Sequence, residues 1–130
     1  MIEDPSIVES MLEFYRHRSA ANVAAFDDLI SSEHVVFLGT AGHEWFEDRD
    51  RMRTAFGFEG VRFEPGPKPR AWSEGSIGWF ADTPTMEVAE GRIRVRTTLV
   101  VRREKDRWKI VHAHYSVGIA DELAAELSPA

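Results

Sequence analysis

The chain has 130 residues, of which 16 are basic and 22 acidic, so its formal net charge is −6. This length is typical of one domain, and we expect residues 1–130 to form a single one. The hydrophobic share of 43% excludes a disordered chain, and no apolar run approaches the roughly 20 residues of a membrane span. The absence of cysteine excludes disulfides, thiolate catalysis and cysteine-bound metal. No apolar leader segment opens the sequence, so we expect a cytoplasmic protein without membrane contact.

Three helices are predicted in the first half of the chain. The first is expected to open at Asp4-Pro5, because proline suits the first helical turn, or at a capping box of Ser6 and Glu9. The second is expected to follow a cap at Asn22, and the third to begin near Asp48. Apolar residues at helical spacing support these helices: Ile7, Val8, Met11, Leu12 and Tyr15, then Val23, Phe26, Leu29 and Ile30, then Met52, Ala55 and Phe56, with Gly57 as a stop. A β-rich run at 34–38, ended by Gly39, separates the second helix from the third.

From Val61 onward the sequence is typical of strands and turns. Alternating prolines at 65–69 indicate an extended segment that is not a central strand. Strands are predicted at about 77–82, 92–103 and 108–118, with Pro84 interrupting after the first and a tight turn at Lys105-Asp106 joining the last two. The tail from Ala120 is expected to form a short helical turn. Helices followed by an antiparallel meander favour an α+β fold in which three helices pack on a curved sheet.

The C-terminal segment 102–116 resembles a known family. Its tryptophan at Trp108, followed by Ile110-Val111-His112-Ala113-His114-Tyr115-Ser116, is similar to the end of the SnoaL-like branch of the NTF2-like superfamily and to the calcium/calmodulin-dependent kinase II association domain. The segments Gly39-Thr40 and Glu44-Trp45 add a second, weaker resemblance. The resemblance implies a cone-shaped α+β roll with a deep pocket, paired into a homodimer through its sheet. It implies no single reaction, because such folds include isomerases, cyclases, dehydratases and assembly modules.

Candidate catalytic and binding residues lie on the last predicted strand. His112, His114 and Ser116 share one face with Trp108 and Ile110 if side chains alternate, and we predict that this face lines the roll. His114 would there hold a ligand or move a proton, because histidine titrates near neutrality. The alternative is a pair of hydrogen-bonded structural histidines. The opposite face, which includes Val111, Ala113 and Val117, is then expected to form the contact between two copies.

A metal site needs more ligands than this strand supplies. His112 and His114 could contribute two, but nothing in the sequence identifies a third ligand such as Asp82 or Glu87. We therefore expect neither a metal nor another cofactor.

Charged residues supply further candidates. Eight basic residues fall within 92–109, but the chain as a whole is acidic, so no nucleic-acid partner is expected. Arg96 would be a buried cation for a carboxylate or phosphate if its strand face points inward, and otherwise belongs to an outward stripe with Arg92 and Arg94. Asp82, close to Trp79, would be a general base if its pKa were raised, or else an ordinary turn residue.

Aromatic residues complete the candidate site. Trp72 and Trp79 would wall a pocket for a flat ligand, with Trp45 and the hydroxyl of Tyr15 as further contacts; the alternative for all four is core packing. The sequence thus favours a domain that binds a small anionic or aromatic molecule in a cone-shaped pocket. The alternatives are a cofactor-independent isomerase, cyclase or dehydratase that uses Asp82 or His114 as its base, and a non-catalytic oligomerisation module.

Overall fold

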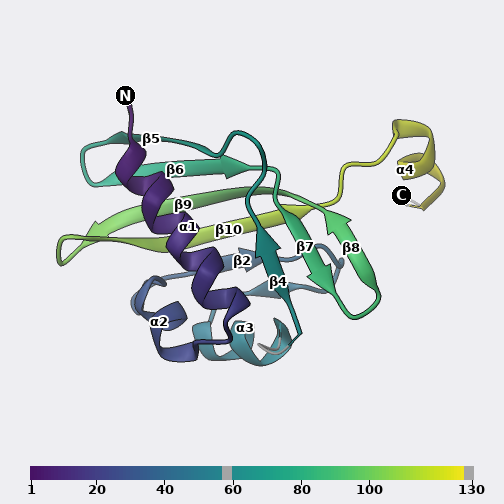
Figure 1. Ribbon diagram of the computed structural model, residues 1–130, viewed down its shortest axis with the longest axis horizontal. Helices are drawn as coiled ribbons and strands as arrows, with labels where there is room; N and C mark the ends of the chain where they lie inside the picture. The colour runs from purple at the N-terminus through teal and green to yellow at the C-terminus, as the bar shows by residue number, and fades with distance from the viewer. Residues whose placement is uncertain (57–59, 128–130) are drawn as a thin grey trace.

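A seven-stranded sheet forms the centre of the computed structural model, which describes residues 1–56 and 60–127 (Figure 1). Its strand order is β1-β5-β6-β9-β10-β2-β3, and β4-β7-β8 form a second, three-stranded sheet. The strands are β1 (Ile2–Glu3), β2 (Val36–Leu38), β3 (Trp45–Phe46), β4 (Arg62–Glu64), β5 (Arg70–Glu74), β6 (Ile77–Asp82), β7 (Thr85–Val88), β8 (Gly91–Arg94), β9 (Arg96–Glu104) and β10 (Arg107–Ser116). The predicted α+β architecture is confirmed. Among the described strands β10 and β2 pair in parallel, and the isolated bridge between Ile30 and Ile110, just before β2, has the same direction.

The helices begin where their caps predict. In α1 (Pro5–Ser19), the side chain of Asp4 accepts a hydrogen bond from the backbone N–H of Ser6 at 3.0 Å. In α2 (Val23–Asp28), Asn22 caps the backbone N–H of Ala25 at 3.2 Å. Asp48 accepts from the backbone N–H of Asp50 at 2.7 Å at the start of α3 (Arg49–Phe56). The short tail helix is α4 (Asp121–Leu127).

The second helix ends earlier than predicted. Leu29 and Ile30 are buried as expected, but they follow α2 rather than belonging to it, so this boundary is wrong. Ile30 instead continues into the bridge with β10. Gly57 and the side chains of Ala55 and Phe56 lie outside the described part of the chain.

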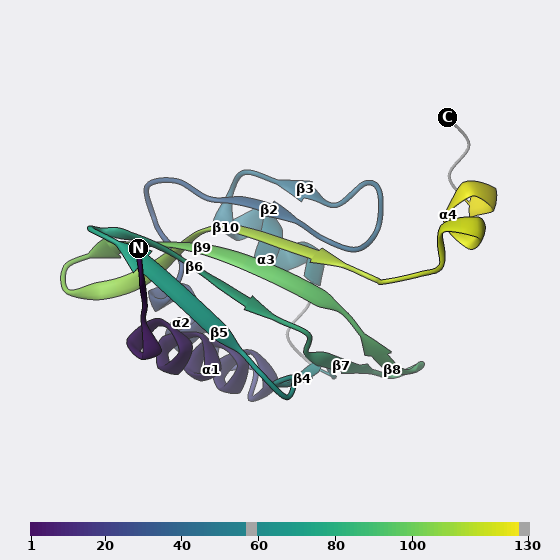
Figure 2. The ribbon, with the colours of Figure 1, turned by 90° about the horizontal axis from the view of Figure 1, so that it is seen from above.

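The helix α1 covers one face of the seven-stranded sheet, called here the inner face (Figure 2). Ile7 of α1 packs so closely on β6 that a Cβ added to Gly78 would lie 2.4 Å from its Cδ1 atom. The buried core lies between this helix and the inner face, with residues such as Met11, Phe80 and Leu99 fully enclosed. The opposite, outer face of the sheet faces away from α1.

The predicted long strand at 92–103 is broken at Val95. This residue is completely buried, and its backbone N–H donates to the carbonyl of Pro84 at 3.0 Å. The break assigns β8 to the second sheet and β9 to the first, which bends the chain around the inner face. The predicted turn at Lys105-Asp106 is confirmed, with φ angles of 51° and 63° that match a tight two-residue hairpin.

A β-bulge in β10 reverses the predicted orientation of its second half. Ile110 pairs with Val101 and His112 pairs with Val100, so Val111 is an extra residue. Ile110 faces inward before the bulge, and Ala113 and Tyr115 face inward after it, as their burial shows. The prediction that the histidines share a face with Trp108 and Ile110 is therefore wrong. The pairing of Val111, Ala113 and Val117 as an outward face fails with it, because Ala113 is fully buried.

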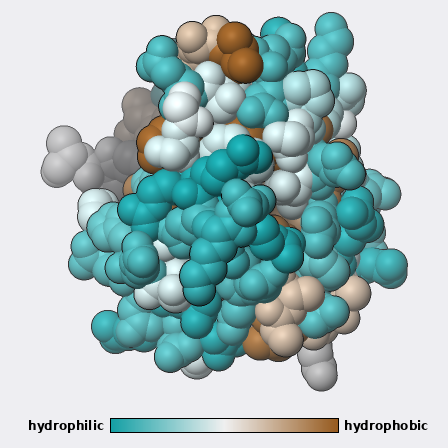
Figure 3. Space-filling model, turned by 90° about the vertical axis from the view of Figure 1, so that its left-hand side faces the viewer, coloured by the Kyte–Doolittle hydropathy of each residue, from teal (hydrophilic) through white to brown (hydrophobic). Residues whose placement is uncertain are grey.

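The surface at the β9–β10 hairpin end is largely hydrophilic, with apolar patches only toward its margins (Figure 3). No helix within the described ranges is both long and apolar enough to cross a membrane.

Candidate functional site

A cavity of about 200 Å³ opens between α1, α3 and the inner face of the sheet. Its walls are mostly apolar, and they come from both sheets and from three helices. The lining residues are Phe14, Arg18, Phe26, Phe37, Gly39, Thr40, Glu44, Met52, Arg53, Val61, Phe63, Met86, Val88, Val95 and Tyr115. The break at Val95 and the bulge at Val111 both contribute, because they bend β8 and turn Tyr115 toward this space.

Arg18 and Tyr115 are the buried polar groups of the cavity wall. Arg18 is 5% exposed and Tyr115 is 7% exposed. Burial lowers the pKa of the Arg18 guanidinium, and the nearby Tyr115 partly opposes this shift. An arginine nevertheless stays charged at neutral pH. Burial raises the pKa of Tyr115 to about 12, so its phenol remains a neutral hydrogen-bond donor. The cavity therefore presents a cation and a phenol from an apolar wall.

Aromatic rings hold these groups in place. Tyr115 packs against Phe37 at 5.4 Å and against Phe63 at 5.9 Å between ring centroids. Phe14 stacks on Phe26 at 4.9 Å, which joins α1 to α2 beside the cavity. A flat apolar molecule would meet ring faces and edges on several sides here.

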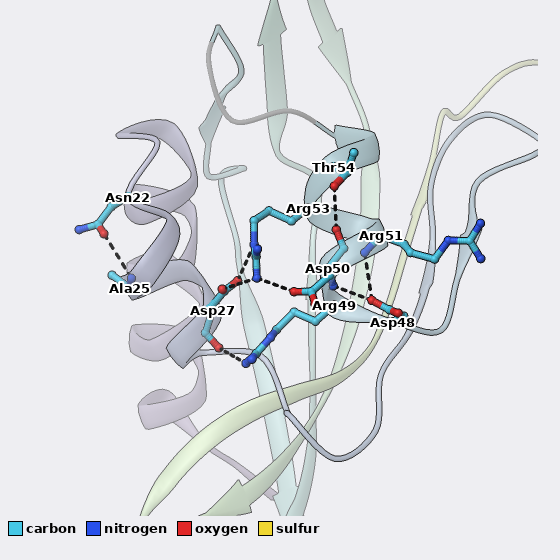
Figure 4. Close-up of polar contacts among 9 residues, drawn as sticks. All are labelled: Asn22, Ala25, Asp27, Asp48, Arg49, Asp50, Arg51, Arg53 and Thr54. Atoms are coloured by element: carbon cyan, nitrogen blue, oxygen red, sulfur yellow. Dashed lines mark hydrogen bonds and ion pairs between the residues drawn. The ribbon is translucent and has the colours of Figure 1, made fainter.

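Ion pairs between α2 and α3 support one wall of the cavity (Figure 4). Arg53 reaches Asp27 at 2.5 Å and Asp50 at 2.9 Å, while Arg49 donates to the carbonyl of Asp27 at 3.3 Å. Arg53 also lines the cavity, but its charge is balanced by two carboxylates. Its main role in this geometry is to hold α3 against α2.

The loop after β2 contributes a carboxylate. Glu44 folds over Gly39, where an added Cβ would lie 2.7 Å from the Glu44 carboxyl carbon. Its Oε1 atom accepts from the backbone N–H of Ala41 at 2.7 Å. Of the residues described as lining the cavity, Glu44 is the one carboxylate, and sequence analysis did not select it as a site residue.

Tyr15 and Asp82 are brought together, as a buried pair. The Tyr15 hydroxyl donates to Asp82 at 2.9 Å, and the same carboxylate accepts from the backbone N–H groups of Gly66 and Thr83 at 3.1 and 2.8 Å. Burial raises the pKa of Tyr15 well above its usual value, with a smaller contribution from the Asp82 charge. Asp82 thus ties the segment before β5 to the end of β6. Neither residue is among those lining the cavity.

The other candidates selected from the sequence lie away from the cavity. Trp72, Trp79 and His112 align through Val100 across β5, β6, β9 and β10, and His114 aligns with Leu38 and Trp45 in the adjacent row. The seven residues that the sheet places on its outer face, or at its edge, are Trp45, Trp72, Trp79, Arg96, His112, His114 and Ser116. Trp45 is 61% exposed, and His114 and Arg96 are exposed. Of the two alternatives for Arg96, the structure therefore favours the outward one over a buried cation, and the prediction that the histidines line the roll is wrong.

Sequence analysis missed Arg18, although a signal was present. Arg18 follows Met11 by seven residues and Phe14 by four, so helical periodicity places it on the buried side of α1. Arginine is rarely buried, and its position in the last turn of α1 also suits the helix dipole, which is why the pattern alone did not identify it. In the described part of the chain, no group of three histidine or carboxylate side chains is arranged to hold a metal ion.

Comparisons with known proteins agree on the fold. No curated protein sequence matched the chain. Among solved structures, a proposed dehydratase of the NTF2-like family from Streptomyces avermitilis superimposes with a TM-score of 0.75 at 16% identity, over 89% of this chain and 96% of that one. The CaMKII association domain from C. elegans gives a TM-score of 0.69 at 15% identity, over 85% of this chain and 92% of that one.

A third structure, an NTF2-like protein of unknown function from Pseudomonas putida, gives a TM-score of 0.73 at 13% identity, over 90% of this chain and 87% of that one. At such identities the likeness concerns the fold alone. The sequence model of the SnoaL-like domain matches residues 7–120, which is most of the chain and includes every element that lines the cavity. The chain therefore belongs to the SnoaL-like domain family of the NTF2-like superfamily.

Proposed function

We propose that this chain binds a small organic acid, with its carboxylate at Arg18 and Tyr115 and its apolar or aromatic body in the cavity. The observation that carries this proposal is the burial of a permanently charged guanidinium in a wall that is otherwise mostly apolar. A guanidinium at the cavity wall can bind a carboxylate through two parallel hydrogen bonds. The Tyr115 phenol would add a third donor.

The size and lining of the cavity support a compact ligand. A cavity of roughly 150 Å³ can hold one benzene molecule. The space of about 200 Å³ here matches one ring with a short carboxylate-bearing chain. Phe14, Phe37 and Phe63 supply aromatic surface for such a ring.

The enzymatic alternative has weaker support. The structures resembled include a proposed dehydratase and a proposed ketosteroid isomerase, but they share only the fold. Asp82 uses its oxygens to bind Tyr15 and the backbone at Gly66 and Thr83, and His114 lies on the outer face. Neither proposed base lines the cavity. Glu44 does line the cavity. If the protein is an enzyme, proton transfer between Glu44 and a bound acid is therefore the reaction that this geometry would support.

Matched probe molecules test the binding proposal. Phenylacetate and its neutral isostere phenylacetamide are compared by thermal unfolding and by calorimetric titration. We expect phenylacetate to raise the melting temperature in a concentration-dependent manner and phenylacetamide to have little effect. Equal responses to the two probes would show that the cation is not used, and no response to a series of aryl and alkyl acids would contradict the proposal. Native mass spectrometry of the freshly purified protein would detect an acid retained from the cell.

Assembly is a second proposal, supported by the outer sheet face. Apolar side chains that are only half-buried line this face, including Trp79 and Val100 in adjacent strands and Val36 beyond His112 in the same row. Contiguous apolar surface of this kind is typical of contacts between proteins. We infer that two copies pair through their outer faces as a homodimer, with the histidines at the contact rather than in the cavity.

A further inference from the structure

A groove of about 730 Å³ lies next to the cavity, between α1 and the strands β4 and β7. The strand β4 runs between that helix and β7 (Figure 1). Exposed charged side chains line the groove, such as Arg16 and Glu87, together with the buried ring of Tyr15 and the half-buried ring of Phe63. Among the described residues, Phe63 is the one that lines both the groove and the cavity.

The ring of Phe63 packs against two tyrosines. Its centroid lies 5.7 Å from that of Tyr15, which lines the groove, and the two rings are nearly parallel at 18°. The same centroid lies 5.9 Å from that of Tyr115, which lines the cavity. Across the β4–β7 pair, Phe63 is opposite Met86, which lines the cavity and not the groove. One aromatic ring therefore separates the cavity from the groove.

The backbone of Phe63 is held independently of its ring. The Ser19 hydroxyl on α1 accepts a hydrogen bond from the backbone N–H of Phe63 at 2.8 Å and donates one to its carbonyl at 3.5 Å. The pairing of β4 with β7 holds the same residue from the other side. Because these bonds use only the backbone of Phe63, a smaller side chain at this position leaves β4 in place and removes the separating ring.

We propose that Phe63 determines the size of the acid that the cavity binds, because its ring separates the cavity from the groove. This inference rests on the acid binding proposed above and assigns its specificity to one side chain. Phe63 packs against Tyr115, the phenol proposed to bind the carboxylate, so its ring lies beside the carboxylate end of the ligand. An acid with a long branch on the carboxylate-bearing carbon is excluded while the ring is present. Without the ring, that branch enters the groove.

Two acids of different size test this role of Phe63. Phenylacetate has one ring, and 2-phenyloctanoate carries an additional hexyl chain on the same carbon. Calorimetric titration of each acid should show that the native chain binds phenylacetate more tightly. The Phe63→Ala variant should bind 2-phenyloctanoate at least about tenfold more tightly than the native chain does, because the hexyl chain becomes buried in the groove against Leu12 and Tyr15.

Two further variants separate an opened cavity from an enlarged one. Met86 is half-buried like Phe63 but lines only the cavity, so Met86→Ala enlarges the cavity without joining it to the groove. We expect Met86→Ala to keep the native preference for phenylacetate. Addition of Arg18→Met to Phe63→Ala should remove the gain for 2-phenyloctanoate, because its carboxylate is no longer bound. A gain that survives this addition would place the acid in the groove alone and overturn the proposal.

The outcomes distinguish this inference from the proposed function. If the native chain binds phenylacetate but Phe63→Ala shows no gain for 2-phenyloctanoate, acid binding stands and the role of Phe63 is rejected. A native chain that binds both acids equally well would reject that role too. A native chain that binds neither acid would reject the acid site and the role of Phe63 with it. If thermal unfolding shows that Phe63→Ala does not fold, Phe63→Leu is titrated instead, with a smaller gain of the same sign expected.

Discussion

The Arg18 guanidinium on α1 lowers the pKa of the Tyr115 phenol on β10, although burial dominates and raises that pKa to about 12. The two groups therefore interact inside the protein while both remain protonated at neutral pH. Two protonated donors on an apolar wall form a site for an acceptor, and a carboxylate is the acceptor that an arginine recognises with both arms of its fork.

Removal of the Arg18 charge should weaken acid binding. In Arg18→Met the apolar stem is retained and the guanidinium is lost, so the affinity for phenylacetate should fall roughly tenfold to a hundredfold. The fold should persist, because methionine suits a buried helix position. Calorimetric titration measures the affinity. Arg16→Met, on the exposed side of the same helix, and His114→Ala, on the outer face, should bind as the native protein does. A loss of affinity in either control variant would show that the acid binds elsewhere than at Arg18.

Alkaline pH should destabilise the protein through its two tyrosines. In the unfolded chain a tyrosine loses its proton near pH 10. Burial raises the pKa of Tyr15, and it raises that of Tyr115 to about 12, so the folded state keeps protons that the unfolded state has lost. The stabilisation is complete below pH 10 and declines above it, by about 1.4 kcal/mol per pH unit for each tyrosine.

Urea unfolding between pH 9 and pH 11.5 measures this slope. The Tyr115→Phe variant should show about half of the decline, because one of the two groups no longer titrates. An unchanged slope in this variant would show that Tyr115 does not retain its proton in the folded state.

Gly39 should not tolerate a side chain. An alanine Cβ at this position would lie 2.7 Å from the Glu44 carboxyl carbon and 2.9 Å from its Cβ. The carboxylate would have to move, which breaks its bond to the backbone of Ala41 and costs about 1–3 kcal/mol in the free energy of unfolding. Gly42→Ala, in the same loop, is the matched control because nothing lies within 4 Å of its added Cβ. Denaturant midpoints that fall equally for both glycines would contradict this account.

A charge placed at the centre of the outer face should separate the homodimer. Thr98 is exposed between Ala81 and His114, so Thr98→Arg adds a long cation without disturbing the core. Across a two-fold contact each copy would meet the new charge of the other. Light scattering should give the monomer mass for this variant and the dimer mass for Glu9→Arg on α1. If the native chain is already monomeric, the outer face has another role.

Helix positions were predictable because their determinants are local. Asp4, Asn22 and Asp48 act on backbone groups two or three residues away, and the structure confirms all three starts. The hairpin turn at Lys105-Asp106 was predictable for the same reason. The family resemblance added the arrangement of these elements, which the family model confirms over residues 7–120.

The candidate site was less predictable because it depends on which way strands face. Alternation along β10 holds on each side of Val111 but not across it, and a bulge leaves little trace in the types of residue around it. For this reason His112 and His114 were predicted to face the interior, whereas the structure places them on the outer face. Likewise, Arg96 was expected to share a regular strand with Arg92, but burial of Val95 breaks that strand into two sheets. The bulge at Val111 and the break at Val95 both shape the cavity, and neither can be predicted from the local residue pattern.

Val111 also changes the parity of the strand. Even-numbered residues face the interior up to Ile110, and odd-numbered residues do so from Ala113 onward. A relative that lacks this one residue would keep Trp108, Ala113 and Tyr115 in the same surroundings, because the pairings on both sides survive its removal. A relative with one more residue at the same point would also keep them if the bulge absorbed it, and would turn Tyr115 to the outside if it did not. The bulge can therefore change the length of this strand by a residue while the same side chains stay in the interior of the sheet.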